Sequence, residues 1–378
     1  MSLFQIDAGK EWRGGQRQSF FLAKELKGRG LPFVFVVQPE SPLHQKALEA
    51  ELPVLALKIR SEFDLRAILR LAWAMKRRKC LLAHFHDAHA VAVGSAAASL
   101  AKVHYRVITR RVDFPLKRNY FSRRKYRKNV DAIIAISDRV RRVMIGGGVN
   151  RKLIEVIPSG IDFSAFDEVS SRDYLRREFS FAPDDYLVGI VAALADHKGH
   201  KYLIQAMKIL KEHSARIKLV IVGHGPLQMD LDRQAKESGV EDIVFFLGFR
   251  QDVPQILASL DLFVLSSYLE GLGSSILDAM ASRLAVVATK TGGIPEIVVD
   301  GETGLLVPPR DPEALAQAIL RLYNDRELAA RFGQRGYELV HQKFSAEAMA
   351  KKVVNVYERI GLASWIKLHQ KEKGDIKD

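Results

Sequence analysis

Short apolar runs alternate with amphipathic segments along both halves of the 378-residue chain. Segments such as 16–29 and 65–78 repeat apolar residues with the period of a helix, whereas the short runs are typical of strands that are buried on both faces. Strands that alternate with helices form parallel sheets through βαβ units. The pattern therefore predicts an α/β protein with two doubly wound, Rossmann-like parallel-sheet domains. The expected strands lie at 3–6, 33–37, 54–59, 81–85, 105–109, 132–136, 155–157, 187–192, 218–222, 243–247, 262–265, 285–288 and 304–307.

Residues 158–183 carry turn residues and several charges and show no strand pattern. We therefore expect the domain boundary there, with a first domain at 1–165 and a second domain at 166–343. Ser345 can cap a final helix, whose apolar residues recur at helical spacing. That helix and the polar tail after it are expected to occupy residues 344–378.

The stretch 270–281 places an acid-bearing, glycine-rich loop between a buried strand and a helix. Ser274 or Ser275 is expected to cap the helix that Ile276 begins. In a parallel sheet such a turn lies at the carboxyl ends of the strands. The free N–H groups of the helix suit a phosphate there, and Glu270 can bind sugar hydroxyls. The turn can therefore hold both halves of a nucleotide-sugar.

Structural explanations stay open for two features of this stretch. Asp278 lies three residues after Ser275, so it is either a ligand-binding residue or the acid of a capping box. Gly271 and Gly273 either let the backbone approach a ligand or form a tight turn only. Glu270 is harder to explain structurally, because an acid at the end of a buried strand needs a partner.

The same stretch resembles the E-x7-E signature of retaining, nucleotide-sugar-dependent glycosyltransferases with the GT-B fold, the glycogen-synthase-like and lipopolysaccharide-type enzymes. The resemblance implies two domains that face an interdomain cleft, with the C-terminal helix crossing back to the first domain. It also implies that Glu270 is catalytic and contacts the donor sugar, and that the second acid, here Asp278 instead of glutamate, holds the ribose. The loop amides that would bind sugar and diphosphate belong to Gly271, Leu272, Gly273, Ser274 and Ser275.

Further donor-binding residues follow from this resemblance. Segment 192–200 is similar to the family's G-R-x-x-x-x-K-G motif, in which arginine and lysine neutralise the donor diphosphate. Lys198 matches as a catalytic and donor-binding residue, but Ala193 stands at the arginine position, so the missing cation would have to come from Arg250 or Arg13. Arg250 is expected to reach the base or a phosphate. The remaining donor-binding candidates are Gly14, Gly15 and Gly223.

The acceptor side of the expected cleft involves the first domain, with Arg13, His86, Asp87, Arg110 and Arg111 as candidates. The two adjacent arginines either bind an anionic acceptor or pair with Asp113. The run 84–89 is close to a zinc-ligand motif, but its aspartate is displaced and no further ligand spacing follows. We therefore expect no metal and no cofactor.

Positive charge is concentrated in the first half of the chain. The net charge is +14, and residues 1–160 hold 31 Lys and Arg against 13 Asp and Glu. The densest stretches are 76–79 and 117–128, and aromatic residues lie between the cations of the second. Such a surface favours an anionic partner. The alternatives are a membrane with anionic lipids, a phosphorylated glycan and nucleic acid. Ordinary solvated helix faces are the alternative to any such partner.

Cysteine content and hydropathy bear on location. The single cysteine, Cys80, permits no intrachain disulfide and favours a reducing compartment. We expect no leader peptide, because the N-terminus lacks a leader-like apolar run. We expect no membrane-spanning segment, because the longest apolar stretch is too short to span a bilayer. The predicted location is the cytoplasm, with peripheral contact with the inner face of the membrane.

These observations and the resemblance together imply a retaining, metal-independent, hexosyl-type glycosyltransferase. It would move a sugar from a nucleotide-diphosphate-sugar to a hydroxyl of a glycan or lipid-linked acceptor, such as a phosphorylated, lipopolysaccharide-type one. A nucleic-acid-binding protein is a rival hypothesis, but it leaves Glu270 and Lys198 unexplained. A catalytically inactive homologue is another, motivated by Ala193 and Asp278.

Overall fold

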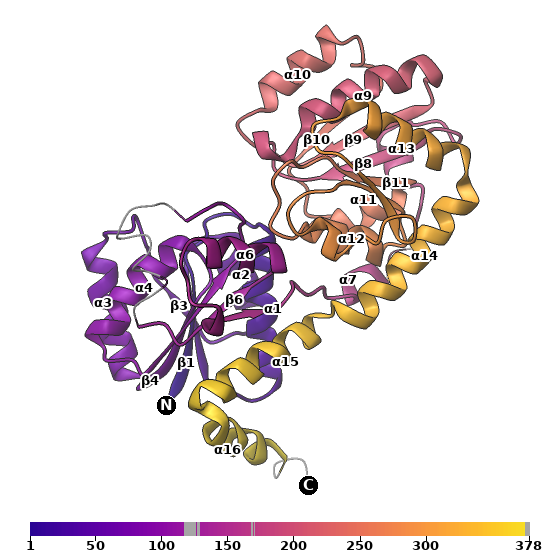
Figure 1. Cartoon of the computed structure of the whole chain (residues 1–378). Helices are drawn as coiled ribbons and strands as arrows, with labels where there is room; N and C mark the ends of the chain where they lie inside the picture. Colours follow the sequence, from indigo (N-terminus) through magenta and orange to yellow (C-terminus); the bar gives the residue numbers. More distant parts are fainter. Residues whose placement is uncertain (117–125, 127–128, 168, 170, 375–378) are drawn as a thin grey trace. The chain divides into compact units, whose positions relative to one another are not determined.

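The computed structural model describes residues 1–116, 126, 129–167, 169 and 171–374, and it divides into two compact units (Figure 1). Unit 1 comprises Met1–Gly160 together with Ala346–Asp378, and unit 2 comprises Ile161–Ser345. The chain thus leaves unit 1 once and returns to it at the end.

Unit 1 is built on a seven-stranded sheet in the order β3-β2-β1-β4-β5-β6-β7, in which every neighbouring pair is parallel. Because the order reverses beside β1, the crossover helices lie on both faces of the sheet. The strands are β1 (Ser2–Asp7), β2 (Phe33–Val37), β3 (Val54–Ala56), β4 (Cys80–Phe85), β5 (Tyr105–Arg110), β6 (Ala132–Ala135) and β7 (Ile154–Val156).

Side chains cap several helices of unit 1 at the positions where the sequence supplies Ser or Asp. Ser41, Asp64, Asp87 and Ser137 each accept a hydrogen bond from a backbone N–H of the first helical turn. The helices are α1 (Gly14–Gly28), α2 (Pro42–Glu49), α3 (Leu65–Arg77), α4 (Ala88–Leu100), α6 (Asp138–Gly146), α15 (Ala346–Tyr357) and α16 (Ala363–Gly374).

The C-terminal helix α15 completes the core of unit 1. Its residues Val353 and Tyr357 are buried in one cluster with Leu22 of α1 and with inward-facing residues of the sheet. A π-helical turn, Glu358–Leu362, joins α15 to α16. Its Gly361 has φ 128°, and a Cβ there would lie 2.2 Å from the Tyr105 hydroxyl. The predicted return of the last helix to the first domain is confirmed.

Unit 2 contains a six-stranded, all-parallel sheet in the order β10-β9-β8-β11-β12-β13. The strands are β8 (Tyr186–Val191), β9 (Ile217–Val222), β10 (Val244–Gly248), β11 (Leu262–Leu265), β12 (Val286–Thr289) and β13 (Gly304–Val307). The helices are α7 (Ser164–Asp167), α8 (Tyr174–Phe179), α9 (His200–His213), α10 (Gln228–Glu237), α11 (Val253–Ser259), α12 (Ser274–Ala281), α13 (Pro312–Asn324) and α14 (Arg326–Lys343).

The predicted fold class, two doubly wound parallel sheets, is confirmed. In both units the order of strands reverses next to the first strand, so the loops beside the reversal diverge at the carboxyl edge of the sheet. Doubly wound sheets bind their ligands at this edge. A functional site in either unit is therefore expected there.

Candidate functional site

The loops after β8 and β11 bring two predicted catalytic residues into contact in unit 2. The Lys198 ammonium donates to Oε2 of Glu270 over 2.5 Å, and the hydroxyl of Ser267 donates to the same oxygen over 3.3 Å. Only 20% of the Lys198 side chain and 12% of the Glu270 side chain are exposed. A partly buried ion pair of this kind interacts more strongly than one in open water.

Hydrogen bonds to backbone carbonyls hold these loops at fixed positions. The Ser266 hydroxyl donates to the Lys198 carbonyl over 3.1 Å, and the Tyr268 N–H donates to the His197 carbonyl over 2.9 Å. The Gly293 N–H, from the loop after β12, donates to the Glu270 carbonyl over 3.1 Å. Three loops at the carboxyl edge therefore support one another beneath the ion pair.

Gly223 lies at the end of β9 against the loop that carries Lys198. Its φ is 143°, and a Cβ there would lie 2.0 Å from the Ala192 carbonyl oxygen. A side chain at this position would push the two loops apart. The contact of Gly223 with a nucleoside stays a prediction, whereas its close backbone packing is observed.

Helix α12 begins differently from the sequence prediction. Gly273, with φ 89°, is its N-cap residue and supplies no side-chain cap, while Ser274 and Ser275 already lie in the first helical turn. The predicted serine cap is wrong, because the left-handed glycine starts the helix before the first serine. The capping-box explanation of Asp278 fails with it, because that explanation requires Ser275 at the N-cap.

The other residues of this stretch are mostly buried. Asp278 is 4% exposed on α12, and Leu272 is 1% exposed. The Leu272 side chain is part of the core, and the donor contact predicted for its backbone amide stays a prediction. Gly271 is also buried, next to Glu270. The ribose contact predicted for Asp278 stays a prediction.

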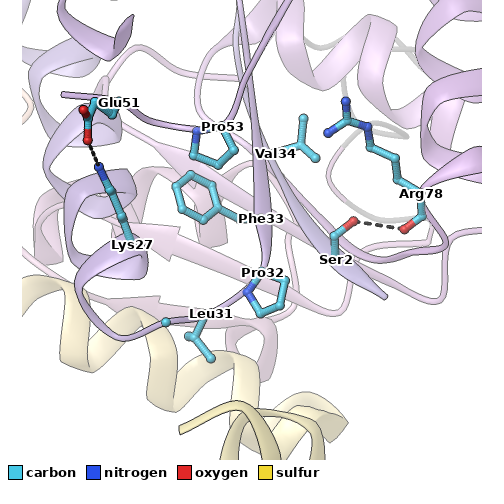
Figure 2. Close-up of a pocket in the computed structure, with 10 residues that line it drawn as sticks. Ser2, Lys27, Leu31, Pro32, Phe33, Val34, Glu51, Pro53 and Arg78 are labelled. Carbon is cyan, nitrogen blue, oxygen red and sulfur yellow. Dashed lines mark hydrogen bonds and ion pairs between the residues drawn. The ribbon is translucent and has the colours of Figure 1, made fainter. Parts of the chain in front are cut away.

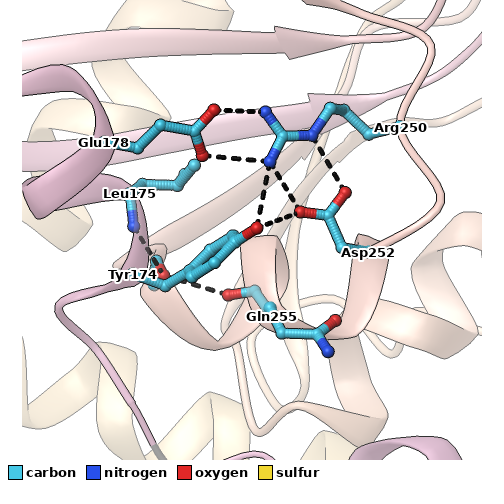
Figure 3. A network of polar contacts seen from close by, with 7 residues as sticks. Tyr174, Leu175, Glu178, Arg250, Asp252 and Gln255 are labelled. Carbon is cyan, nitrogen blue, oxygen red and sulfur yellow. Dashed lines mark hydrogen bonds and ion pairs between the residues drawn. The ribbon is translucent and has the colours of Figure 1, made fainter.

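Arg250 is held by carboxylates of its own unit (Figure 3). Its guanidinium donates to Glu178 over 2.5 and 3.0 Å, to Asp252 over 2.9 and 2.6 Å, and to the Tyr174 hydroxyl over 3.1 Å. These bonds, first those to Asp252, raise the Arg250 pKa, and they lower the pKa of Asp252 to about 2. Two carboxylates outweigh one guanidinium, so this cluster does not favour Arg250 as the replacement for the cation missing at Ala193. Its predicted contact with the donor stays a prediction.

A second group of polar residues lies at the carboxyl edge of the unit 1 sheet. Asp7, at the end of β1, accepts hydrogen bonds from the Gly9 N–H, from the Gln16 amide and from the Ser19 hydroxyl. Asp87 caps α4 and accepts a hydrogen bond from the Ala8 N–H over 2.6 Å. Burial, and then the charge of Asp7, raise the pKa of Asp87 to about 6.

Arg111 supplies the cation beside these two acids. Burial lowers the pKa of its guanidinium to about 10, and the charges of Asp7 and Asp87 oppose that effect. A Cβ on Gly15 would lie 3.3 Å from Cδ of Arg111, so the arginine stem packs against the glycine loop that begins α1. The structure thus brings Gly15, Asp87 and Arg111 together in unit 1.

His84 and His86 belong to a buried hydrogen-bonded chain. The His84 ring bonds the Tyr357 hydroxyl over 2.6 Å and the Thr109 hydroxyl over 2.7 Å, while Nε2 of His86 bonds the Gln5 amide oxygen over 2.7 Å. Burial lowers the pKa of His84 to about 3 and that of His86 well below its usual value, so both rings are neutral near pH 7. His84 is therefore a core histidine with both ring nitrogens hydrogen-bonded.

His86 is 3% exposed, and its Nδ1 has no partner within the described part of the chain. It borders a cavity of about 10 Å³, which is also lined by Arg111, Thr109 and Ser159. In the part of the chain that the structure describes, no three His, Cys, Asp or Glu residues are grouped to hold a metal ion.

Two further acceptor candidates and Gly14 lie closer to the surface. Arg13 is the N-cap residue of α1 and pairs with Glu11 over 2.6 Å, and Gly14 is the first residue of the helix. Arg110 donates to the carbonyls of Val112 and Phe114 and to the Tyr126 hydroxyl. In this structure Arg110 therefore holds the loop after β5. Asp113, the alternative partner considered for the arginines, lies 4.0 Å from the Arg139 guanidinium.

A hollow of about 610 Å³ lies elsewhere in unit 1 (Figure 2). It is lined by residues at the amino ends of the strands, such as Ser2, Pro32 and Phe33, beside the exposed Lys27–Glu51 ion pair. Ligands of doubly wound sheets bind at the opposite edge, so we do not assign this hollow to the substrate.

Several residues of these clusters were missed by sequence reasoning. Asp7 is an acid at the end of a buried strand, the same signal that identified Glu270, and could have been found in that way. Gln5 and Tyr357 meet across 352 residues, and no local pattern connects them.

The aromatic basic stretch 117–128 lies outside the described residues except for Tyr126. No helix in the described part of the chain is long and apolar enough to cross a bilayer.

Comparisons with known proteins bear on the family and the fold of this chain. Residues 171–339 match the family model described as glycosyl transferases group 1, and residues 12–165 match the model described as glycosyltransferase family 4. The chain is 30% identical over 249 residues to the putative glycosyltransferase EpsD of Bacillus subtilis (strain 168), which is 64% of this chain and 63% of that protein. It is 31% identical over 242 residues to the lipopolysaccharide core biosynthesis glycosyltransferase LpsE of Rhizobium meliloti (strain 1021), 64% of this chain and 66% of that protein.

The matched part spans between about half and two thirds of the length of the curated relatives. Among solved structures, Alr3699/HepE of Anabaena in complex with UDP and glucose is similar, with a TM-score of 0.85 and 22% sequence identity. The similarity covers 95% of this chain and 100% of that one. At this level of identity the likeness establishes the fold.

Proposed function

We propose that this chain, which has the GT-B fold and matches the group 1 glycosyltransferases over residues 171–339, is a retaining enzyme of that family. In this proposal it transfers a hexosyl group from a nucleotide-diphosphate-sugar to a hydroxyl. The acceptor in this proposal is an anionic glycan or lipid-linked glycan of the lipopolysaccharide type. The proposed location is the cytoplasm, at the inner face of the membrane. Transfer is proposed to need neither a metal ion nor a cofactor.

The observation that carries this proposal is the partly buried pair of Lys198 and Glu270 at the carboxyl edge of unit 2. A pyrophosphate leaving group develops negative charge in the transition state, and a fixed ammonium stabilises it. Glu270 is proposed to hold hydroxyls of the donor sugar, because a carboxylate accepts hydrogen bonds from such groups. The N-terminus of α12 adds backbone N–H groups that suit the same anion.

The nucleotide is proposed to be uridine diphosphate. The similar Anabaena protein forms a complex with UDP and glucose, and the two chains share their fold. For the acceptor, the support is chemical: Arg111 keeps its positive charge near neutral pH and lies beside Gly15 and the two acids of unit 1. A guanidinium can bind a phosphate or a carboxylate in a bidentate manner.

Replacement of Glu270 tests the function. We expect Glu270→Ala to reduce kcat/KM for sugar transfer by about 10² to 10³, a typical cost of removing a group that stabilises the transition state. The assay follows the release of UDP from a panel of UDP-sugars, with extracts of cell-envelope glycans as acceptors. Asp242→Ala is the matched control, because it removes the acid of an exposed Lys–Asp pair in the same unit.

Three results would contradict the proposal, and each points to a different conclusion. Unchanged transfer by Glu270→Ala would remove this residue from the mechanism. Absence of transfer by the unaltered protein, with UDP still raising its Tm, would indicate an inactive homologue. Stabilisation by DNA but not by UDP would favour nucleic-acid binding.

A further inference from the structure

Helix α3 exposes a row of large apolar side chains. Leu65, Leu69 and Trp73 are 72%, 63% and 62% exposed, and Phe63, just before the helix, is 85% exposed. The spacing of four residues puts the three helical members on one side of α3. Single exposed apolar residues are ordinary, whereas a contiguous row of this kind marks an interaction surface.

The core of unit 1 does not use this row. The opposite face of α3 already buries Ile68, Leu71 and Met75, and the helix packs against α4 on that side. Folding therefore accounts for one apolar face of the helix and leaves the second exposed in the described part of the chain.

Basic residues surround the exposed row. Arg66 and Arg70 lie on the same outer side of α3, and the Arg77 guanidinium lies 5.1 Å from the ring centroid of Trp73. Within the described residues, Arg66, Arg70 and Lys76 form no ion pair. The segment 58–79 contains eight lysines and arginines and two acids, and one of these acids, Asp64, caps the helix.

The start of α3 lies at the functional edge of unit 1. Strand β3 ends at Ala56, and the following loop leads to Phe63 and Leu65. Because every strand of the sheet is parallel, this loop shares its edge with Asp87 and Arg111. In Figure 1, α3 lies at the outside of unit 1 beside α4.

We propose that Phe63, Leu65, Leu69 and Trp73 dock unit 1 on a bilayer that contains anionic lipids. Apolar side chains of an interfacial helix enter the boundary between headgroups and acyl chains, and the neighbouring arginines bind lipid phosphates. A second copy of the chain would bring two basic surfaces together, and nucleic acid offers no partner for leucine side chains. An anionic bilayer can bind both parts of this surface, because its acyl chains accept the apolar side chains and its phosphates pair with the arginines. The inference rests on the proposed membrane location and is independent of sugar transfer.

Vesicle co-sedimentation of the full chain tests the surface. We expect binding to vesicles of phosphatidylcholine mixed with phosphatidylglycerol, and little binding to phosphatidylcholine alone. Higher salt should weaken the binding, because it screens the arginine–phosphate attraction. Equal binding to both kinds of vesicle, or binding to neither, would overturn the proposal.

Substitutions separate the apolar contribution from the charged one. Leu69→Ser with Trp73→Ser should weaken vesicle binding by at least about tenfold, since each side chain loses its burial in the bilayer. Met229→Ser is the control, because Met229 is 83% exposed on α10 of unit 2. Arg66→Gln with Arg70→Gln should weaken binding roughly fivefold for each charge removed. Arg331→Gln with Arg335→Gln, on the exposed side of α14, matches that change in net charge.

Further measurements distinguish the remaining outcomes. All variants replace exposed side chains, so each should keep the Tm of the unaltered protein and its transfer rate with a water-soluble acceptor. Vesicle binding that survives both α3 variants would refute this surface. If the unaltered protein binds no vesicles and the α3 variants lose a dimer mass that it shows in light scattering, α3 contacts a second copy instead. Loss of transfer with vesicle binding intact would count against the proposed function only.

Discussion

At the level of single residues, the proposed chemistry of unit 2 depends on the Lys198–Glu270 pair. The Nζ–Oε2 distance of 2.5 Å is that of direct contact. A donor diphosphate would compete with Glu270 for the ammonium. Binding of the donor and release of the carboxylate for sugar hydroxyls are then linked events.

Replacing Lys198 should affect catalysis more than donor binding. Lys198→Met is expected to lower kcat by on the order of 10²-fold, because the leaving diphosphate carries more charge in the transition state than in the bound donor. The Kd for UDP should rise only about tenfold, the scale of one charge-assisted hydrogen bond. Steady-state kinetics and calorimetry measure the two quantities, with Lys211→Met, from an exposed ion pair, as control. A large rise in Kd with normal kcat would assign Lys198 to binding alone.

At the level of elements, the Arg250 cluster joins α8 to the loop before α11. Glu178 belongs to α8, Asp252 is the N-cap residue of α11, and one guanidinium bonds both carboxylates. This explains why a polar, charged loop keeps a fixed course at the carboxyl edge. The Tyr174 hydroxyl adds a third partner from α8.

The Asp252 carboxylate should make the stability of unit 2 depend on pH in the acid range. Its folded pKa is lowered from 3.8 to about 2, so the unfolded chain binds the proton more readily. The stabilisation is complete above pH 4 and is lost as pH falls toward 2. The urea midpoints of the unaltered protein and of Asp252→Asn should therefore differ most at pH 5 to 7 and converge below pH 4. Asp230→Asn, at an exposed site on α10, should leave the midpoint unchanged throughout, and a constant gap for Asp252→Asn would contradict the assigned shift.

At the level of the whole molecule, the chain end is needed to complete the unit where the chain begins. Residues 346–374 return to unit 1, and the Tyr357 hydroxyl bonds both Gln5 of β1 and His84 of β4. The buried polar chain at the carboxyl edge of unit 1 thus contains a residue from the last helices. Unit 1 is complete only after the rest of the chain has been synthesised.

Removing that hydroxyl should destabilise unit 1. Tyr357→Phe leaves the Gln5 amide and the His84 ring each without one partner in a buried place, which costs about 1–3 kcal/mol. Chemical denaturation followed by far-UV circular dichroism measures the loss. Tyr202→Phe is the control, because Tyr202 lies partly exposed on α9. Equal stability of Tyr357→Phe and the unaltered protein would show that the buried chain contributes nothing to folding.

Local pattern was sufficient for the sheets and for the existence of the last helix, whereas the return of that helix to unit 1 was implied by the family resemblance. Strands buried on both faces, glycine at turns and acids at strand ends are short-range features, so periodicity and spacing reveal them. The same local reasoning failed at α12, where Gly273 takes a left-handed conformation and starts the helix ahead of the serines. It was also silent on Tyr357, whose partners lie hundreds of residues away.

The sequence by itself determined two doubly wound sheets and the residue types available at their carboxyl edges. Only the tertiary structure decided which of these residues meet: Lys198 with Glu270, Gly15 with Arg111, and Arg250 with the acids of α8 and α11. The physical reason is the separation along the chain between the residues that interact. Helix and strand period is written in neighbouring residues, whereas the partner of a charge is set by strand order and loop packing between segments far apart in the chain.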